Sequence, residues 1–391
     1  MKDLDWIFDY GFLGMRFYDL PNFFICVIFV MVAGRALKVS VLYQSVLLLH
    51  CLLPFVLNGV LFPFEYMPDA LKYWRSFNAI RTGDMGILDS WLGGNVNQAA
   101  VLFALMPFPV AVSPISLGFY NAFLYAALFF WLYRKQVFTP VSLWFFLLYP
   151  SMSLYTGMGL RDTFVFVFMV LAVQWAREGK WWLTFFPLYL LFEIKFQNFF
   201  ILGPALLIYV LLGIRKAGIS VGRAVAVVVV LIVTLIAASP FALPKVNKFR
   251  VAMYIEDGGD VGDVALISSP GEFVLSGLVD GLLFLSKPFP WEAGSPLQLV
   301  QAVENMVVLF FLFFVIRVAW KQVPRKLTFW LLFMALALSV YGLVVFNYGT
   351  AARYRYPFVV MFVLFVCADC GVNRMLNVRL KRRNRIVKKV S

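Results

Sequence analysis

Hydrophobic runs, each about as long as a membrane-crossing helix, recur along the chain from residue 20 to residue 373. A membrane helix needs roughly 20 mainly apolar residues. The pattern therefore predicts an all-α fold, a polytopic transmembrane helical bundle of about eleven spans. The predicted spans are 20–37, 39–63, 116–134, 138–154, 160–177, 181–195, 197–214, 222–243, 299–319, 327–346 and 356–373.

Lysine and arginine in the short connections set the predicted orientation, because cytoplasmic loops carry an excess of these residues. With the N-terminus outside, eleven spans place every basic connection on the cytoplasmic side. The basic tail 374–391 then also lies in the cytoplasm, which we expect for a bacterial inner-membrane protein. The basic residues of the connections are Arg35, Lys38, Arg134, Lys135, Arg177, Lys180, Arg215, Lys216, Arg223, Lys321, Arg325 and Lys326.

Two long segments lie on the outer side in this topology, within a single integral membrane domain 1–391. The first, 64–115, contains a short apolar stretch (99–112) that we expect to be re-entrant or interfacial, since a full crossing would invert every later loop. The second, 244–298, contains an amphipathic piece, 272–285, whose apolar stripe predicts a helix lying in the interface.

Composition excludes several classes of protein. Of the 391 residues 62% are hydrophobic and 14% charged, against about 45–50% and 25% in soluble domains. A net charge of +14 raises the question of nucleic acid, but the tail 374–391 alone holds eight basic residues. Because that tail follows an apolar span, it indicates topology and contact with anionic membrane lipids, and we expect no nucleic-acid partner.

Metal and redox chemistry have little support in the sequence. The single histidine, His50, lies within a predicted span, where we expect it to form a packing hydrogen bond between helices. The four cysteines also lie in apolar runs. Cys367 and Cys370 form a C-x-x-C, which fits one turn of a membrane helix better than a redox or metal site. We therefore predict no metal site built by the chain alone.

Several cations lie on the outer side, where the positive-inside bias disfavours them. Arg161 begins the fifth span, Arg353 and Arg355 begin the last, Lys195 lies in the turn at 195–197, and Arg75 follows the second span. Arginine donates in a fork that matches phosphate oxygens, so this set predicts a phosphate or pyrophosphate site. Two alternatives stay open: Arg161 pairs with its neighbour Asp162, or the arginines simply reach lipid headgroups.

Two carboxylates in the first outer segment are the candidate catalytic residues, Glu65 and Asp69. A carboxylate at this boundary can act as a general base on an acceptor hydroxyl, or can hold a divalent cation against a pyrophosphate. The cofactor therefore stays unknown at this stage. The alternative for Asp69 is a helix N-cap, because Pro68-Asp69 followed by Ala-Leu-Lys-Tyr-Trp is typical of a helix start.

Three stretches together resemble the polytopic glycan-assembly enzymes of the GT-C superfamily, including O-antigen polymerases of the Wzy kind. They are Asp69-Ala-Leu-Lys-Tyr-Trp-Arg-Ser-Phe-Asn-Ala-Ile-Arg-Thr-Gly83, Tyr149-Pro-Ser-Met-Ser-Leu-Tyr-Thr-Gly-Met-Gly-Leu-Arg161-Asp162 and Arg353-Tyr-Arg-Tyr-Pro357. Pro288-Phe-Pro-Trp-Glu292, before a span, is similar to bacterial polysaccharide proteins. The resemblance covers about a fifth of the chain, and the sequence lacks the separate soluble C-terminal domain of larger GT-C enzymes.

The resemblance implies a membrane glycosyltransferase or polymerase that acts on a polyprenyl-(pyro)phosphate-linked glycan at the periplasmic face, in surface polysaccharide biosynthesis. Asp69 or Glu65 would then serve as the base or metal-linked carboxylate. Arg161, Arg353 and Arg355 would hold the donor phosphate. Partners in a polysaccharide assembly complex would also be expected. The competing hypotheses are a transporter or flippase of the same lipid-linked glycan and a non-catalytic scaffold for such a complex.

Overall fold

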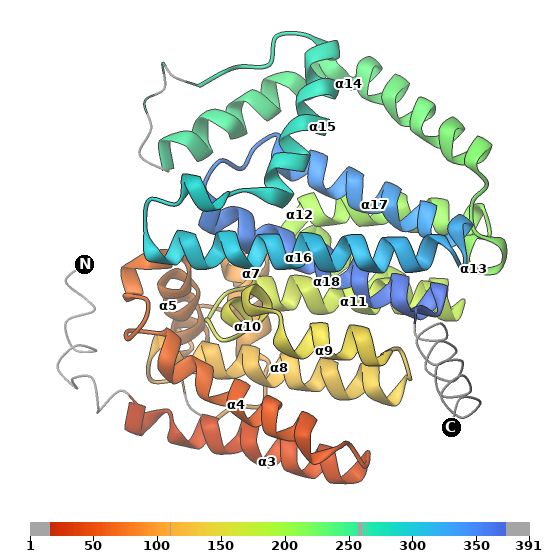
Figure 1. Ribbon diagram of the computed structural model, residues 1–391. Coiled ribbons are helices and arrows are strands. Elements are labelled where there is room, and N and C mark those ends of the chain that lie inside the picture. The colour runs from red at the N-terminus through yellow and green to blue at the C-terminus, as the bar shows by residue number, and fades with distance from the viewer. Residues whose placement is uncertain (1–15, 110, 257–259, 261, 263, 373–391) are drawn as a thin grey trace, which may run out of the picture. The chain divides into compact units, whose positions relative to one another are not determined.

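The computed structural model describes residues 16–372 except 110, 257–259, 261 and 263 (Figure 1). In these ranges it consists of α-helices and short 3-10 turns, and no β-strand occurs. Asn58 and Phe62 form one isolated bridge at the end of a helix. The all-α fold predicted from the hydrophobic pattern is confirmed.

The helices divide into two compact units. Unit 1 contains the chain up to Val137 and Phe146–Phe200, and unit 2 contains Phe138–Phe145 and the chain from Ile201 onward. The helices of unit 1 are α3 (Leu20–Ala36), α4 (Val41–Leu57), α5 (Pro68–Thr82), α6 (Ile87–Leu92), α7 (Asn95–Ala104), α8 (Pro114–Arg134), α10 (Pro150–Thr156) and α11 (Asp162–Glu178), with the 3-10 turn η2 (Phe64–Tyr66).

Two helices contribute to both units, α9 (Pro140–Leu148) and α12 (Trp181–Leu211). The helices of unit 2 are α13 (Ile214–Ala217), α14 (Val221–Glu256), α15 (Pro270–Ser286), α16 (Pro296–Trp320), α17 (Pro324–Gly342) and α18 (Tyr348–Cys370), with the 3-10 turn η4 (Pro290–Glu292). The central helix of unit 1 is α8, with 78% of its apolar window buried, and the central helix of unit 2 is α18, with 89%.

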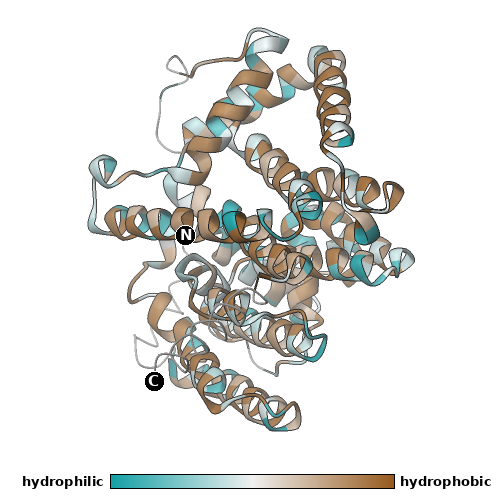
Figure 2. Cartoon of the chain, turned by 45° about the vertical axis from the view of Figure 1, so that its right-hand side comes forward, coloured by the Kyte–Doolittle hydropathy of each residue, from teal (hydrophilic) through white to brown (hydrophobic). Residues whose placement is uncertain are grey.

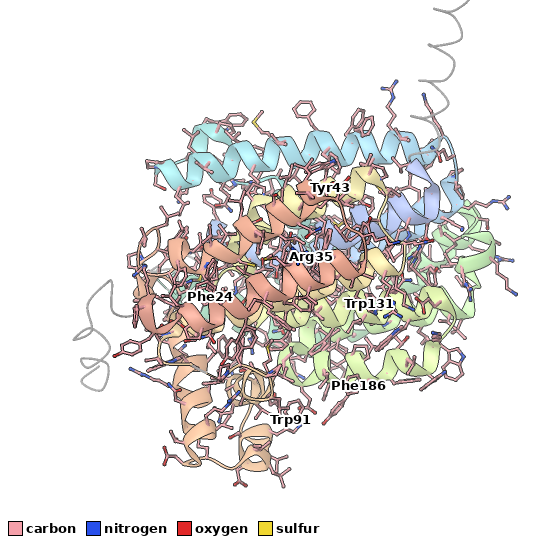
Figure 3. All side chains as sticks on the ribbon, turned by 90° about the horizontal axis from the view of Figure 1, so that it is seen from below. Phe24, Arg35, Tyr43, Trp91, Trp131 and Phe186 are labelled. Carbon is pink, nitrogen blue, oxygen red and sulfur yellow. The ribbon has the colours of Figure 1, made fainter. Side chains whose placement is uncertain are left out.

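Six helices in the described ranges, α8, α12, α14, α16, α17 and α18, are long and apolar enough to cross a membrane. Helices α3 and α4 are also apolar but have 17 residues each. Figure 2 shows how widely hydrophobic residues cover the helices. In Figure 3 the aromatic rings of Phe24 and Phe186 point outward, and they are 54% and 61% exposed. The chain is therefore a multi-pass membrane protein, while the predicted count of eleven spans is not confirmed.

Prolines and a glycine explain where helices differ from the predicted spans. The predicted span 138–154 is two short helices, because α9 ends before Pro150 and α10 begins there. The predicted span 39–63 is helical only to Leu57, and Gly59 follows with a φ of 74°. Helix α14, in contrast, continues through Pro244 into the segment predicted as an outer loop.

Helix starts in both units share one local signature, a serine followed by proline. Ser113, Ser269 and Ser295 each accept a hydrogen bond from a backbone N–H in the first turn of α8, α15 and α16. Proline at the first helical position has the required φ and lacks an N–H that would otherwise be unpaired. A helix predicted at 272–285 is observed as α15, whereas its place in the membrane interface stays a prediction.

The stretch 99–112, predicted to be re-entrant or interfacial, overlaps α7, which has only 10 residues.

The long helical run α12 reverses direction at Lys195. Its backbone is extended there, with φ −156° and ψ 73°. The rings of Phe192 and Phe199 lie 5.3 Å apart between centroids. Residues seven apart on a straight helix would be separated by about 10 Å. The two aromatic side chains therefore face each other across a turn.

Contacts with α11 confirm the reversal. Thr184 donates a hydrogen bond to the carbonyl of Ala172 at 3.5 Å, and Asn198 donates to the sulfur of Met169 at 3.0 Å. Fourteen residues of straight helix would rise about 21 Å, whereas the two partners on α11 are only three residues apart. The sequence prediction of a break at 195–197 is confirmed, and Lys195 lies at the tip of a helical hairpin.

Candidate functional site

Arg161 immediately precedes α11 and is the most unusual cation of unit 1. Two of its side-chain nitrogens, Nε and Nη1, are shielded from solvent and have no hydrogen-bond partner. The guanidinium carbon lies 6.0 Å from the ring centroid of Tyr73 on α5. In the described part of the chain no ion pair joins Arg161 to Asp162, which speaks against the pairing alternative. The headgroup alternative stays a prediction.

A rigid loop places Arg161. Between α10 and α11, Asn121 of α8 donates hydrogen bonds to the carbonyls of Met158 at 2.6 Å and Leu160 at 2.7 Å. Asn58 donates to the carbonyl of Gly157 at 3.1 Å. These bonds satisfy backbone groups that burial would otherwise leave unpaired.

Glycine is required where the loop meets α8. A Cβ atom on Gly118 would lie 2.7 Å from the carbonyl oxygen of Gly157, and one on Gly159 would lie 2.8 Å from the Cβ of Leu117. Real Cβ atoms do not approach other atoms so closely. The Thr-Gly-Met-Gly-Leu segment therefore packs its backbone directly on α8, which fixes the position of the arginine that follows.

Asp69 lies on the same helix as the tyrosine that Arg161 faces. It occupies the first turn of α5, two residues beyond the N-cap, which is Met67. Its side chain is 35% exposed and pairs with Lys72 at 3.4 Å. Because residues four apart share one face of a helix, Asp69 and the buried Tyr73 occupy adjacent positions on one face of α5. Tyr73 thus links the candidate base to Arg161.

The other candidate residues of the first outer segment occupy different positions. Arg75 is exposed, and it lies two residues from Tyr73, on another face of α5. Glu65 lies in η2, but its side chain is outside the described residues. The basic tail 374–391 also lies outside them.

At the hairpin tip Lys195 is 5% exposed. The neighbouring carboxylate of Glu193 accepts a hydrogen bond from Gln98 of α7 at 2.6 Å. The donor is the Nε2 of Gln98, and the amide oxygen of Gln98, Oε1, is buried and has no partner. The tip is therefore tied to the short helix α7 by a charge-assisted hydrogen bond.

In unit 2, Arg355 has a structural set of partners. Its Nη1 donates to the carbonyls of Phe284 at 3.1 Å, Leu285 at 3.0 Å and Lys287 at 3.0 Å, which belong to the C-terminal end of α15 and the residue after it. Arg355 is 2% exposed. Its cation thus satisfies helix-end carbonyls, which favour positive charge. Arg353 is 7% exposed and lies 5.7 Å from the ring centroid of Tyr354.

One buried acid of unit 1 has no counterpart among the residues singled out from the sequence. Asp19 is fully buried at the start of α3, and its carboxylate accepts hydrogen bonds from Ser113 and Ser116 at 2.6 Å and from Asn22 at 3.0 Å. Burial raises the pKa of Asp19 from 3.8, and the three hydrogen bonds oppose the shift. The only sequence signal for it was an aspartate directly before a span.

His50 and the cysteines show no sign of metal or redox chemistry in the described residues. His50 shares a hydrogen bond of 2.9 Å with Thr156 and stacks on Tyr125 at 4.0 Å between ring centroids, which confirms its predicted packing role. The four cysteines are free thiols. Among the described residues, no group of three or more His, Cys, Asp and Glu side chains is arranged to hold a metal ion.

Comparison with protein-family models, with curated proteins and with solved structures found no match to this chain. Its candidate site therefore rests on its own geometry.

Proposed function

We propose that the chain is an inner-membrane glycosyltransferase or polymerase that transfers a sugar or oligosaccharide from a polyprenyl-(pyro)phosphate-linked donor. The reaction takes place at the periplasmic face and contributes to a surface polysaccharide. One observation carries the proposal: the two buried, unpartnered nitrogens of Arg161, beside a tyrosine that neighbours the carboxylate of Asp69.

An unsatisfied guanidinium is costly enough to suggest a missing partner. A buried donor without a hydrogen bond costs about 1–3 kcal/mol, and more when it is charged. A phosphate oxygen would accept from Nε or Nη1 and would supply the opposite charge. Arg161 also stands at the start of α11, where free backbone N–H groups add positive potential. A phosphate-bearing ligand satisfies both features at once.

In the proposed reaction Asp69 and Arg161, which both lie near Tyr73, have different roles. Asp69 takes the proton from an acceptor hydroxyl, and the hydroxyl oxygen forms a bond to the anomeric carbon of the donor. The bond from that carbon to the phosphate oxygen breaks, and the polyprenyl (pyro)phosphate leaves with the bonding electrons. Arg161 stabilises the charge that develops on the departing phosphate. Glu65 is the alternative base.

The remaining outer cations have more limited roles in this proposal. Lys195 and Arg353 are buried cations that add positive potential, each within its own unit. Arg355 is assigned to positioning, because backbone carbonyls already occupy its guanidinium. Arg75, exposed on α5, is assigned to contact with anionic headgroups.

The test is the surface polysaccharide of cells that carry Arg161→Ala, separated on a gel, with the protein level followed by immunoblot. We expect the glycan ladder to be shortened or absent while the protein persists. Arg161→Lys keeps the charge but loses the fork, and we expect partial recovery at most. Arg177→Ala is the matched control, since Arg177 lies at the other end of α11 and donates to Gln174.

A normal ladder in Arg161→Ala at wild-type protein level would overturn the proposal. A deletion strain in which the lipid-linked glycan accumulates on the cytoplasmic side would also overturn it, because a flippase is then the better description. Lipid-linked glycan that reaches the outer leaflet unextended supports the proposal.

A further inference from the structure

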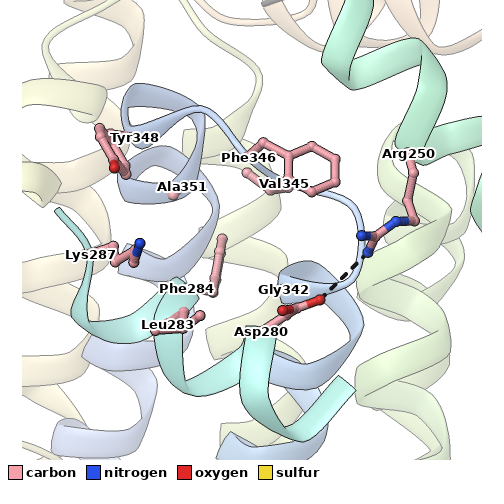
Figure 4. Close-up of a pocket in the computed structure, with 10 residues that line it drawn as sticks. All are labelled: Arg250, Asp280, Leu283, Phe284, Lys287, Gly342, Val345, Phe346, Tyr348 and Ala351. Carbon is pink, nitrogen blue, oxygen red and sulfur yellow. Dashed lines mark ion pairs between the residues drawn. The ribbon is translucent and has the colours of Figure 1, made fainter. Parts of the chain in front are cut away.

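Unit 2 contains a pocket of about 220 Å³ (Figure 4). None of the candidate catalytic or phosphate-binding residues lines it. It lies where α14, α15 and the start of α18 approach one another. Its volume corresponds to about seven water molecules, which is the size of a single monosaccharide ring with its hydroxyl groups. The residues that line it are Arg250, Asp280, Leu283, Phe284, Lys287, Gly342, Val345, Phe346, Tyr348 and Ala351.

Two glycines let the walls of the pocket approach closely. A Cβ atom on Gly342 of α17 would lie 2.5 Å from the backbone of Asp280, and one on Gly281 would lie 2.9 Å from the backbone nitrogen of Ser339. Small residues at a crossing let helix backbones touch. The close crossing of α15 and α17 fixes the backbone of Asp280 at the edge of the pocket.

Arg250 is fixed on one wall by hydrogen bonds from Nε and Nη1, and its Nη2 remains available to donate to a ligand. It is 6% exposed, its Nε donates to the carbonyl of Ala265 at 3.2 Å, and its Nη1 donates to the carbonyl of Leu343. Its guanidinium carbon lies 5.0 Å from the ring centroid of Phe346. No hydrogen bond within the described residues occupies Nη2. The arginine is therefore preorganised rather than mobile.

The charges of the pocket balance. Arg250 pairs with Asp280 at 3.5 Å, the interaction drawn in Figure 4, and Lys287 pairs with Glu292 at 2.9 Å. Hydrogen bonding to Glu292 raises the pKa of Lys287, and the same bond lowers the pKa of Glu292. Glu292 does not itself line the pocket, but it pairs with Lys287, which does, so each cation of the lining already has a carboxylate partner. A phosphate or other anion would have to displace these carboxylates, whereas a neutral ligand would not.

The rest of the lining suits a ligand with an apolar face and a polar edge. Phe284, Phe346 and Tyr348 supply aromatic surface, and the hydroxyl of Tyr348 adds a polar group to the lining. A sugar ring presents C–H groups on its faces and hydroxyls around its rim. Apolar walls with a few placed polar groups are the usual form of a small-molecule site.

We infer that this pocket binds one uncharged monosaccharide unit of a glycan. Asp280 accepts hydrogen bonds from sugar hydroxyls, Arg250 and Tyr348 donate to ring or hydroxyl oxygens, and Phe284 lies against the apolar face. That the sugar belongs to a lipid-linked glycan rests on the function proposed above. The location and neutral character of the site rest on the pocket alone.

The experiment uses the full-length protein in lipid nanodiscs and saturation-transfer NMR. The probes are the methyl glycosides of glucose, galactose, mannose and N-acetylglucosamine, with methyl glucuronide and methyl phosphate as charged probes. We expect saturation transfer to at least one neutral glycoside and weaker transfer to the charged probes.

Three variants and one control locate the binding. Asp280→Asn should raise the dissociation constant for that glycoside about tenfold, and Tyr348→Phe should raise it about threefold, because each variant loses hydrogen bonds to the sugar. Ala351→Leu should abolish the signal by filling the pocket without changing its charge. Tyr254→Phe is the matched control, because Tyr254 packs on Phe346 at 5.9 Å between centroids but does not line the pocket.

Absence of transfer from wild-type protein to every neutral glycoside overturns the inference. So does preferential binding of methyl phosphate or methyl glucuronide, or a dissociation constant that is unchanged in both Tyr348→Phe and Ala351→Leu. None of these results would change the conclusion drawn from the glycan ladder of the Arg161 variants. Conversely, a normal ladder in those variants with sugar binding in the pocket overturns the proposed reaction alone.

Discussion

The side-chain oxygen of Asn305 on α16 accepts a hydrogen bond from Arg355 on α18. Both residues are buried, and both also bind the carbonyl of Lys287, Arg355 at 3.0 Å and Asn305 through its Nδ2 at 2.8 Å. The two side chains act together to hold the segment that follows α15. An arginine selected from the sequence as a phosphate ligand is, in the structure, a fixed support for a chain segment.

Arg355→Met is therefore expected to destabilise the protein rather than only inactivate it. The change leaves three carbonyls and the Asn305 oxygen without a charged donor, and the free energy of unfolding should fall by about 3 kcal/mol or more. Thermal unfolding in detergent measures the loss. Arg223→Ala, at an exposed position of α14, should leave the midpoint unchanged.

A double-mutant cycle with Asn305→Ala separates a shared role from two independent ones. We expect the two changes to be less than additive by about 1 kcal/mol or more, because either alone disrupts the same support. Strict additivity would show that the two side chains stabilise different parts of unit 2.

Asp19 should make the stability of the protein depend on pH in a definite direction. Its pKa in the folded state is raised above 3.8, so the folded state binds the proton more tightly than the unfolded chain does. Stability from this group is therefore present at low pH and is lost as pH rises from about 3.8 through the raised folded pKa. In Asp19→Asn, which cannot titrate, that part of the pH dependence should disappear.

The measurement is the difference in unfolding midpoint between wild type and Asp19→Asn from pH 4 to pH 8. The difference should move against the wild type as pH increases. A constant difference would contradict the assigned pKa direction. Asp19→Ala, which leaves Ser113 and Ser116 without their acceptor, should cost about 1–3 kcal/mol at low pH and less as pH rises, because it removes the same titrating group.

Gly118→Ala tests the contact between α8 and the loop before Arg161. The added methyl group would lie 2.7 Å from the carbonyl of Gly157, and overpacking of this kind costs about 1–3 kcal/mol. We also expect a shortened glycan ladder, because the loop must shift. In Gly222→Ala the new methyl meets no atom within 4 Å, so stability should be unchanged or slightly higher.

The hairpin at Lys195 predicts a specific cross-link. Met169→Cys with Asn198→Cys should form a disulfide under mild oxidation, since the native side chains are in contact at 3.0 Å. The control pair, Met169→Cys with Phe200→Cys, should stay reduced, because Phe200 is 59% exposed and lies two residues away on a different face. Mass spectrometry of peptides detects both outcomes. Cross-linking of the control alone would disprove the turn.

Much of the fold could be predicted from hydrophobic periodicity, because one helix needs only its own sequence to form. The break at Lys195 and the helix at 272–285 are examples. The ends of the spans were harder to predict, because the effect of a proline depends on its neighbours. Pro150 begins a new helix, whereas Pro244 lies inside α14. The hydrophobic pattern does not show which tertiary contacts surround a proline, so it does not predict whether the helix ends there.

The candidate site was predictable only in part. The place of Arg161 at the start of a helix followed from the hydrophobic pattern, whereas its proximity to Tyr73 depends on a tertiary contact that spacing does not reveal. Arg355 has the same sequence signature as Arg161, an outer arginine at the start of a helix. Only their partners distinguish the two residues. Arg355 donates to backbone carbonyls, whereas Nε and Nη1 of Arg161 form no hydrogen bond. The pocket around Arg250 joins segments about 100 residues apart, beyond any local motif.

The amide groups of Asn58 and Asn121 clamp the loop before Arg161 from two different helices. Its conformational entropy is therefore lost when the protein folds, not when a ligand arrives. Binding at Arg161 should accordingly show a small entropy penalty and little dependence on loop motion, unlike binding at a site that closes with a mobile lid. Affinity there is governed by desolvation of the incoming anion.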